Sequence, residues 1–257
     1  MFAKLLGKDR FLDADLEDFC LETWGWLLAN LGGVEHLAKT SWVTPSRDFF
    51  PPTEATGADR AAHLFTCVKT LMGMADWPCR LTSYDRAAGH EQVGEFLFVN
   101  NPEQPNGLFW IEDGEGRIEY AADLIAQPQL LTAVFAHELS HYLLAGLPDP
   151  PQEGSVAHEL ATELCVAFTG FGVFAANTAF AFAQHGDGFS QGWRSQRNGY
   201  LSDRAWAFAL ALFGVLKGEP APQKWLKDGL KPTVRAAEKY LSRQEARLTP
   251  LRAIVTA

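Results

Sequence analysis

Cysteine is scarce in this 257-residue chain, and its spacing matches no metal-binding pattern. The four residues, Cys20, Cys67, Cys79 and Cys165, stand far apart. This scarcity excludes a metal site built from cysteine pairs and gives no sign of a disulfide framework. We therefore expect buried, reduced thiols.

Long hydrophobic runs are absent as well. The most apolar helix-like stretch, residues 205–216, is too short to cross a bilayer and follows directly after Asp203 and Arg204. Residues 1–10 lack the apolar core of a signal peptide. The sequence therefore predicts no membrane span and a cytoplasmic location.

Positive charge is outnumbered by negative charge. The chain has 22 basic and 31 acidic residues, a formal net charge of −9 and no basic run. Nucleic acids and anionic membranes attract clustered lysine and arginine, so we exclude both as main partners. The chain is 47% hydrophobic and has no repeat, low-complexity tract or long linker. We therefore expect a single domain over residues 1–257.

What the chain does contain is an HExxH sequence, His137-Glu138-Leu139-Ser140-His141. Four residues are just over one helical turn, so both imidazoles project from one helix face and can hold a divalent metal. Glu138 points slightly aside, where its carboxylate can reach a metal-bound water. In such sites the metal lowers the pKa of that water, and the glutamate takes and returns the proton.

The residues around this motif indicate a buried helix. Pro128 stands where a helix would begin, and Gly146 with the proline-rich residues 148–151 ends it. Apolar side chains recur at helical spacing through the motif, namely Leu131, Val134, Phe135, Leu139 and Tyr142. The alternative is a buried helix whose two histidines are only hydrogen-bonded.

A catalytic zinc needs a third protein ligand and an open position for water. The next expected helix, residues 156–168, carries Glu159 and Glu163 four residues apart on one face. Two carboxylates on a largely apolar helix are costly unless a cation meets them. Glu159, Glu163 and the neighbouring His158 are the alternatives for the third ligand. His158 lies about 100° round the helix from Glu159, so we do not expect these two to share one metal.

On these motifs the chain resembles the gluzincin branch of the zincin metallopeptidases. There, HExxH is followed one helix later by a glutamate ligand, with an acidic residue four positions beyond it. The resemblance covers about residues 117–172 and implies Glu159 as a zinc ligand and Glu163 as a group that orients a ligand histidine. The family more often has aspartate at the latter position. The extended motif of other zincins fails, because Leu144 and Leu147 replace its glycine and third histidine.

A peptidase of this kind also needs a donor for the oxyanion that forms when water attacks the amide. In the gluzincins a tyrosine or histidine from a later segment does this. Residues 184–200 form the longest polar, glycine-rich stretch of the C-terminal half, and Tyr200 and His185 are our catalytic candidates there. Arg194 and Arg197 are alternative binders of the active-site carboxylates.

The order of elements predicts an α+β fold, mostly helical and zincin-like, with a small sheet before the HExxH helix. Helices are expected over residues 13–31 with Asp13 or Asp15 as cap, over 58–74, over 173–183, over 203–217 with Ser202 as cap, and from Pro232 to about 248. In chain order, the expected domain has an N-terminal helical layer (about 1–75), then the sheet and the metal-site helices (about 79–172), and then the C-terminal helices (about 173–257).

The sheet includes a hairpin in which residues 108–112 and 117–120 flank the turn sequence Asp113-Gly114. In the zincins an edge strand above the metal binds extended peptide. The resemblance therefore implies such a strand here, and residues 117–120 are our candidate. The alternative is that these residues belong to an ordinary hairpin of a small sheet.

The sequence thus predicts a cytoplasmic zinc metallopeptidase that binds one Zn²⁺ per chain and hydrolyses peptide or protein substrates. The alternative is a zinc-binding regulatory or interaction protein without peptidase activity, which a ligand shell completed by His158 or His185 would favour. Hydrolysis of a non-peptide substrate is a third hypothesis, because fold and metal do not fix the substrate. The sequence leaves open the oligomeric state and the use of manganese, iron or cobalt.

Overall fold

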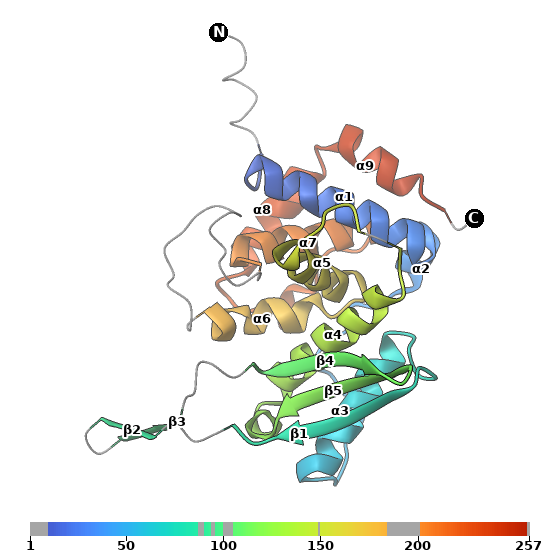
Figure 1. The fold of residues 1–257 in the computed structure, drawn as a ribbon. Helices are drawn as coiled ribbons and strands as arrows, with labels where there is room; N and C mark the ends of the chain where they lie inside the picture. Colours follow the sequence, from blue (N-terminus) through green and yellow to red (C-terminus); the bar gives the residue numbers. More distant parts are fainter. Residues whose placement is uncertain are drawn as a thin grey trace. The chain divides into compact units, whose positions relative to one another are not determined.

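The computed structural model describes residues 10–86, 90–93, 96–99, 105–148, 150–183 and 201–255. The described part is mostly helical with a small sheet, which confirms the expected α+β class (Figure 1). The chain groups into two compact units, one of Met1–Thr44 with Gly146–Ala257 and one of Pro45–Ala145. The zincin-like relationship and the single-domain organisation stay predictions. Within the described ranges, no helix is both long enough and apolar enough to cross a membrane.

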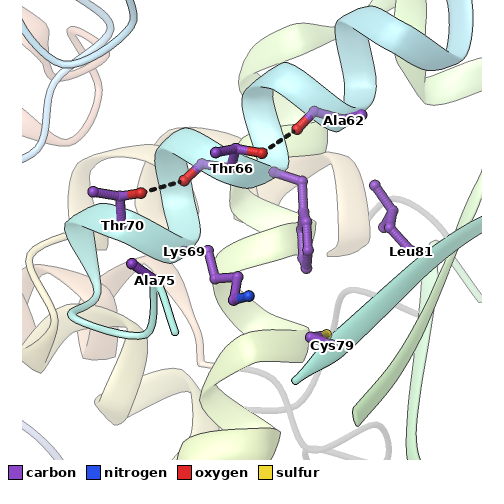
Figure 2. Close-up of a pocket in the computed structure, with 8 residues that line it drawn as sticks. Ala62, Thr66, Lys69, Thr70, Ala75, Cys79 and Leu81 are labelled. Atoms are coloured by element: carbon purple, nitrogen blue, oxygen red, sulfur yellow. Dashed lines mark hydrogen bonds between the residues drawn. The ribbon is translucent and has the colours of Figure 1, made fainter. Parts of the chain in front are cut away.

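In the second unit two helices cover one face of a three-stranded mixed sheet. Its order is β1-β5-β4, with the central strand parallel to β1 and antiparallel to β4. On the covered face, Cys79 and Leu81 of β1 point toward α3 (Figure 2). The elements are α3 (Gly57–Leu71), β1 (Cys79–Tyr84), β4 (Gly107–Glu112), β5 (Glu115–Ala121), the short η1 (Ala122–Ala126) and α4 (Pro128–Ala145), with a separate antiparallel pair of β2 (His90–Val93) and β3 (Phe96–Val99).

Strands β4 and β5 form the predicted hairpin, but the prediction of an edge strand at residues 117–120 is wrong. Asp113 and Gly114 have φ angles of 53° and 77°, the left-handed conformations that a tight two-residue hairpin turn requires. Beyond this turn, β5 pairs with β4 on one side and with β1 on the other. Its backbone groups are therefore already used, and the edges of this sheet are β1 and β4.

Aromatic rings fix α4 against α3 and the sheet. The buried ring of Phe135 lies edge-on to Phe65 of α3 and Tyr120 of β5, with centroids 5.2 and 5.4 Å apart. Two turns later, Tyr142 lies edge-on to Trp77 at 5.0 Å and donates a hydrogen bond to the Pro78 carbonyl at 3.0 Å. Because these contacts hold the same side of α4 at both ends, they set the rotation of the helix about its axis.

The first unit is built around α7 (Asp203–Lys217). Residues 205–214 of this helix are all buried, which explains why they form the most apolar helical stretch of the chain. The Ser202 hydroxyl caps the helix as predicted, accepting from the Ala205 N–H at 3.3 Å. The other elements of this unit are α1 (Ala14–Asn30), α2 (Gly33–Lys39), α5 (Ser155–Phe168), α6 (Gly172–Ala183), η3 (Gln223–Trp225), α8 (Lys231–Leu241) and α9 (Glu245–Arg252).

The predicted helix boundaries are confirmed at α1 and corrected at the C-terminus. Asp13 caps α1, its side chain accepting from the Asp15 N–H. The single helix expected from Pro232 to residue 248 is two helices, because the chain turns between Leu241 and Glu245. This turn lets α9 pack on α1 as well as on α7.

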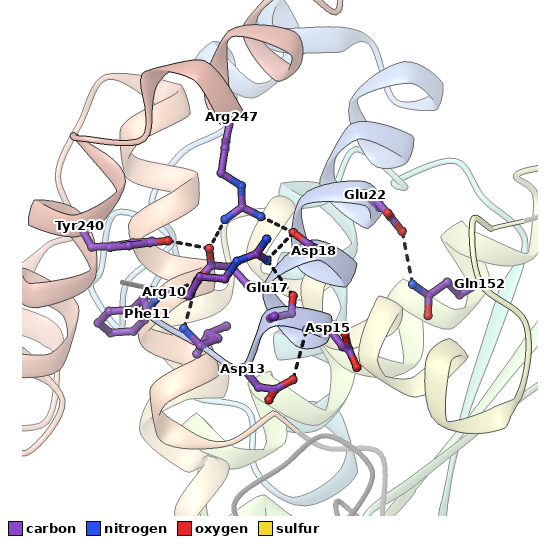
Figure 3. Close-up of polar contacts among 12 residues, drawn as sticks. Arg10, Phe11, Asp13, Asp15, Glu17, Asp18, Glu22, Gln152, Tyr240 and Arg247 are labelled. Atoms are coloured by element: carbon purple, nitrogen blue, oxygen red, sulfur yellow. Dashed lines mark hydrogen bonds and ion pairs between the residues drawn. The ribbon is translucent and has the colours of Figure 1, made fainter. Parts of the chain in front are cut away.

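A buried carboxylate ties α1 to these C-terminal helices (Figure 3). The Glu17 side chain is fully buried and accepts from the backbone N–H groups of Phe11 and Leu12 at 2.9 and 3.1 Å. The Tyr240 hydroxyl donates to it at 2.7 Å, and Arg247 forms an ion pair with it. A buried carboxylate is tolerated only when it is paired and hydrogen-bonded, and these four donors meet that requirement for Glu17.

We predict that Glu17→Gln lowers the free energy of unfolding by about 2–4 kcal/mol, because the partly buried Arg247 loses one of its two charged partners and keeps only Asp18. Chemical denaturation followed by tryptophan fluorescence measures the change. Glu22→Gln is the matched control on the same helix. Glu22 is exposed and accepts one hydrogen bond from Gln152 at 3.3 Å, so its loss should stay below about 0.5 kcal/mol. Equal losses in both variants would contradict the role given to Glu17.

Candidate metal centre

The HExxH motif lies on α4, as predicted, with its two imidazoles next to each other. The Nε2 atoms of His137 and His141 are 3.1 Å apart, and both side chains are half-buried. His137 and His141 lie about 200° and 240° round the helix from Phe135, counting 100° per residue. The ring contacts that bury Phe135 therefore turn both histidines to the other side of α4.

The two histidines form a group with Glu159 of α5. Each residue offers one ligand atom, and these atoms all lie within 4.8 Å of one another. In the part of the chain that the structure describes, this group contains neither Glu163 nor His158. Of the three third-ligand candidates, the structure thus brings Glu159 to the histidines, in a group that could bind a metal ion.

The donor set of this group fits zinc. Zinc accepts imidazole nitrogen and carboxylate oxygen at about 2.0–2.2 Å in tetrahedral geometry, which separates neighbouring donor atoms by roughly 3.3 Å. The 3.1 Å between the two Nε2 atoms is close to this separation. Three protein ligands are also the number found in catalytic zinc sites, whereas structural sites have four. The role of the three residues as zinc ligands stays a prediction.

Strand β4 contributes two residues that the sequence analysis missed. The ring of Phe109 stacks on the His141 imidazole, with centroids 6.3 Å apart and planes 3° from parallel. Gly107 has no side chain, and its backbone lies close to Glu138. A Cβ at this position would lie 2.6 Å from the glutamate Oε1 and 2.7 Å from Val134 Cγ1. A glycine at the start of a strand often marks such a close approach, and this was the available signal.

Glu138 itself is buried, with 6% of its surface exposed, and it lies near the carboxyl end of β1. Burial raises the pKa of the Tyr84 phenol, and the charge of Glu138 contributes to the rise, whereas nearby Arg86 opposes it. The Tyr84 hydroxyl donates to the Pro105 carbonyl. These contacts bring a phenol and a guanidinium into the electrostatic environment of Glu138, and the sequence analysis singled out neither.

The remaining candidates divide into described and undescribed residues. Glu163 is buried one turn beyond Glu159 on α5, and its expected role in orienting a histidine stays a prediction. The catalytic candidates His185 and Tyr200 lie outside the described residues, as do Arg194 and Arg197.

The four cysteines are free thiols, but only two of them are buried as expected. Cys20 and Cys165 are buried, and burial raises the pKa of the Cys20 thiol. Cys67 and Cys79 are half-buried. None of the four belongs to the group that contains the histidines.

No family model matches the chain, and neither a curated protein nor a solved structure gives a match. A function for the site therefore has to be argued from its residues.

We predict that the purified chain binds about one zinc ion and that Glu159→Gln weakens its affinity for zinc more than Glu163→Gln does. The first change removes one of three ligands. The second should cost only about 10–100-fold, as the loss of a group that orients a ligand does. Competition with a chromogenic chelator measures both affinities. The opposite ranking would assign the ligand role to Glu163.

We also predict that Gly107→Ala destabilises the protein by about 1–3 kcal/mol, because the added methyl group must push β4 away from α4 at Glu138. Thermal or chemical denaturation measures the loss. Gly229→Ala is the matched control, since a Cβ at Gly229 meets nothing within 4 Å. If Gly107→Ala were as stable as this control, the close approach of β4 to Glu138 would be incorrect.

Proposed function

We propose that the protein is a zinc-dependent metallopeptidase in which His137, His141 and Glu159 hold the metal and Glu138 is the general base. One observation carries the proposal. Three zinc-type ligand atoms lie within 4.8 Å of one another, and the carboxylate in the same motif is buried yet belongs to no part of that ligand group. A carboxylate beside the ligands but outside their set occupies the position of the general base in HExxH sites.

When bound, zinc would supply Lewis-acid chemistry, lowering the pKa of a water molecule and polarising the substrate carbonyl. The Glu138 carboxylate accepts the proton that the attacking water loses and gives it to the leaving amine, so that the carboxylate is regenerated in each cycle. Phe109 restrains the imidazole plane of His141 by stacking on it. Gly107 and Val134 limit the space in which the Glu138 side chain can move.

Strand β4 is our proposal for the substrate-binding edge, in place of residues 117–120. It lies at an edge of its sheet, and it carries both Gly107 beside Glu138 and Phe109 on His141. An extended peptide that adds a strand to this edge would pass the candidate base and one candidate ligand. Leu108 and Trp110 are 44% and 39% exposed, so the same strand offers apolar contacts for peptide side chains.

We predict that Glu138→Gln keeps zinc content near the wild-type level and lowers the rate of peptide hydrolysis by about 10²–10⁴-fold, because it removes the base and leaves the ligands. The measurement is mass spectrometric analysis of a mixed peptide library treated with zinc-loaded proteins. Glu153→Gln, a change at an exposed position, is the control and should alter neither quantity.

Two outcomes would contradict the proposal in different ways. A folded, zinc-loaded wild type that cuts no peptide would favour the zinc-binding regulatory protein. Equal cleavage by wild type and Glu138→Gln would show that another residue is the base, or that a contaminating protease is responsible.

A further inference from the structure

A cavity of about 330 Å³ lies between α3 and β1 in the second unit and shares no residue with the histidine and glutamate group (Figure 2). Its apolar surface includes Phe65 from α3 and Leu81 from β1, with Ala75 from the loop between these elements. Ligand sites are usually apolar hollows with a few polar groups, and volumes begin at about 300 Å³. The size of this cavity therefore suits a small molecule rather than a polymer segment.

Lys69 is the charged residue that lines the cavity. Its half-buried side chain extends from α3 toward Cys79 and Leu81 of β1 (Figure 2). The hydroxyls of Thr66 and Thr70, which also line the cavity, already donate to the backbone carbonyls of Ala62 and Thr66 at 2.9 and 2.8 Å. The Lys69 ammonium is thus the lining group that can donate hydrogen bonds to a ligand.

The groups near Lys69 do not neutralise its charge. Burial raises the pKa of the Cys79 thiol to about 11, so this side chain is uncharged at neutral pH. The nearby Glu115 carboxylate is held by Arg117 at 3.0 Å and by Arg80 at 3.7 Å. Within the described ranges, the Lys69 side chain makes no hydrogen bond or ion pair, whereas its backbone carbonyl accepts from the Met74 N–H at 2.9 Å. Among the described residues, the Lys69 ammonium therefore has no acidic partner, and it faces a cavity lined by both apolar and hydroxyl-bearing side chains.

We propose that this cavity is a binding site for a small carboxylate with a short apolar body. The carboxylate accepts from Lys69 Nζ, and the body lies against Phe65 and Leu81. A phosphate is the weaker candidate, because phosphate sites combine several donors, such as arginine forks or a helix N-terminus. Here one ammonium group is the charged donor, and the two threonine hydroxyls that line the same cavity already donate to backbone carbonyls. This site is independent of the proposed peptidase activity.

Sodium octanoate is a suitable probe, because it combines one carboxylate with a chain that this volume accommodates. The full-length protein is first freed of metal with a chelator, so that no carboxylate can bind to zinc. Isothermal titration should then give one saturable site with a Kd on the order of 0.1–1 mM, as expected for a ligand of about ten heavy atoms. Octan-1-ol and acetate, which lack the charge and the chain respectively, should each bind at least about tenfold more weakly.

Substitutions at Lys69 test the charge directly. Lys69→Met should weaken octanoate binding at least about tenfold, whereas Lys69→Arg should keep it within about threefold. Lys39→Met is the matched control, the same change at an exposed lysine of α2. No saturable octanoate binding to wild type, equal binding by Lys69→Met, or equal affinity for octan-1-ol would each overturn the proposal.

A measurement on the wild-type chain keeps the proposal testable if a variant does not fold. Octanoate in the cavity should slow the reaction of Cys79 with N-ethylmaleimide at least about threefold, because Cys79 lines the site. Cys67 is equally half-buried, does not line the cavity and serves as the internal control in the same mass spectrum. Unchanged labelling of Cys79 at saturating octanoate, or equal slowing of both cysteines, would place octanoate elsewhere and refute the site.

Discussion

Phe135 is buried where α3, α4 and β5 meet, with its ring edge-on to Phe65 and Tyr120. A helix packed through one large ring cannot rotate without losing that contact, since interiors are close-packed. The rotation of α4 in turn determines where every other side chain on it points. Glu138 lies about 60° from Phe135 round the helix, and His137 and His141 lie about 160° and 120° away. Both Glu138 and His141 meet β4. One hydrophobic contact thus fixes the directions in which the candidate base and the two histidines point.

The parts of the fold that the sequence predicted well are those controlled by neighbouring residues. Asp13 and Ser202 cap helices because a side-chain oxygen can reach a backbone N–H two or three residues later. The Asp113-Gly114 turn forms because these residues tolerate left-handed angles. The HExxH spacing places two imidazoles together on any regular helix, so the Nε2 separation of 3.1 Å follows from local geometry.

The parts that the sequence did not predict depend on residues far apart in the chain. Residues 117–120 alternate as an edge strand would, and only the pairing with β1, more than thirty residues earlier, makes β5 central. The same pairing brings Tyr84 near Glu138. The helix expected over residues 13–31 is followed directly by α2, which begins at Gly33 and which the sequence analysis did not predict. Gly32 and Gly33 each have a positive φ angle, which ends one helix and redirects the next.

The Glu17 network has a consequence for the order in which the chain can fold during synthesis. Its acceptor, Glu17, is synthesised 223 residues before Tyr240 and 230 residues before Arg247. The second unit is one continuous segment, Pro45–Ala145, so all its contacts become available in mid-synthesis. The first unit is discontinuous and must wait for its C-terminal helices. In a nascent chain, the Glu17 carboxylate and the apolar face of α1 therefore stay exposed to solvent and to chaperones until α8 and α9 have been synthesised.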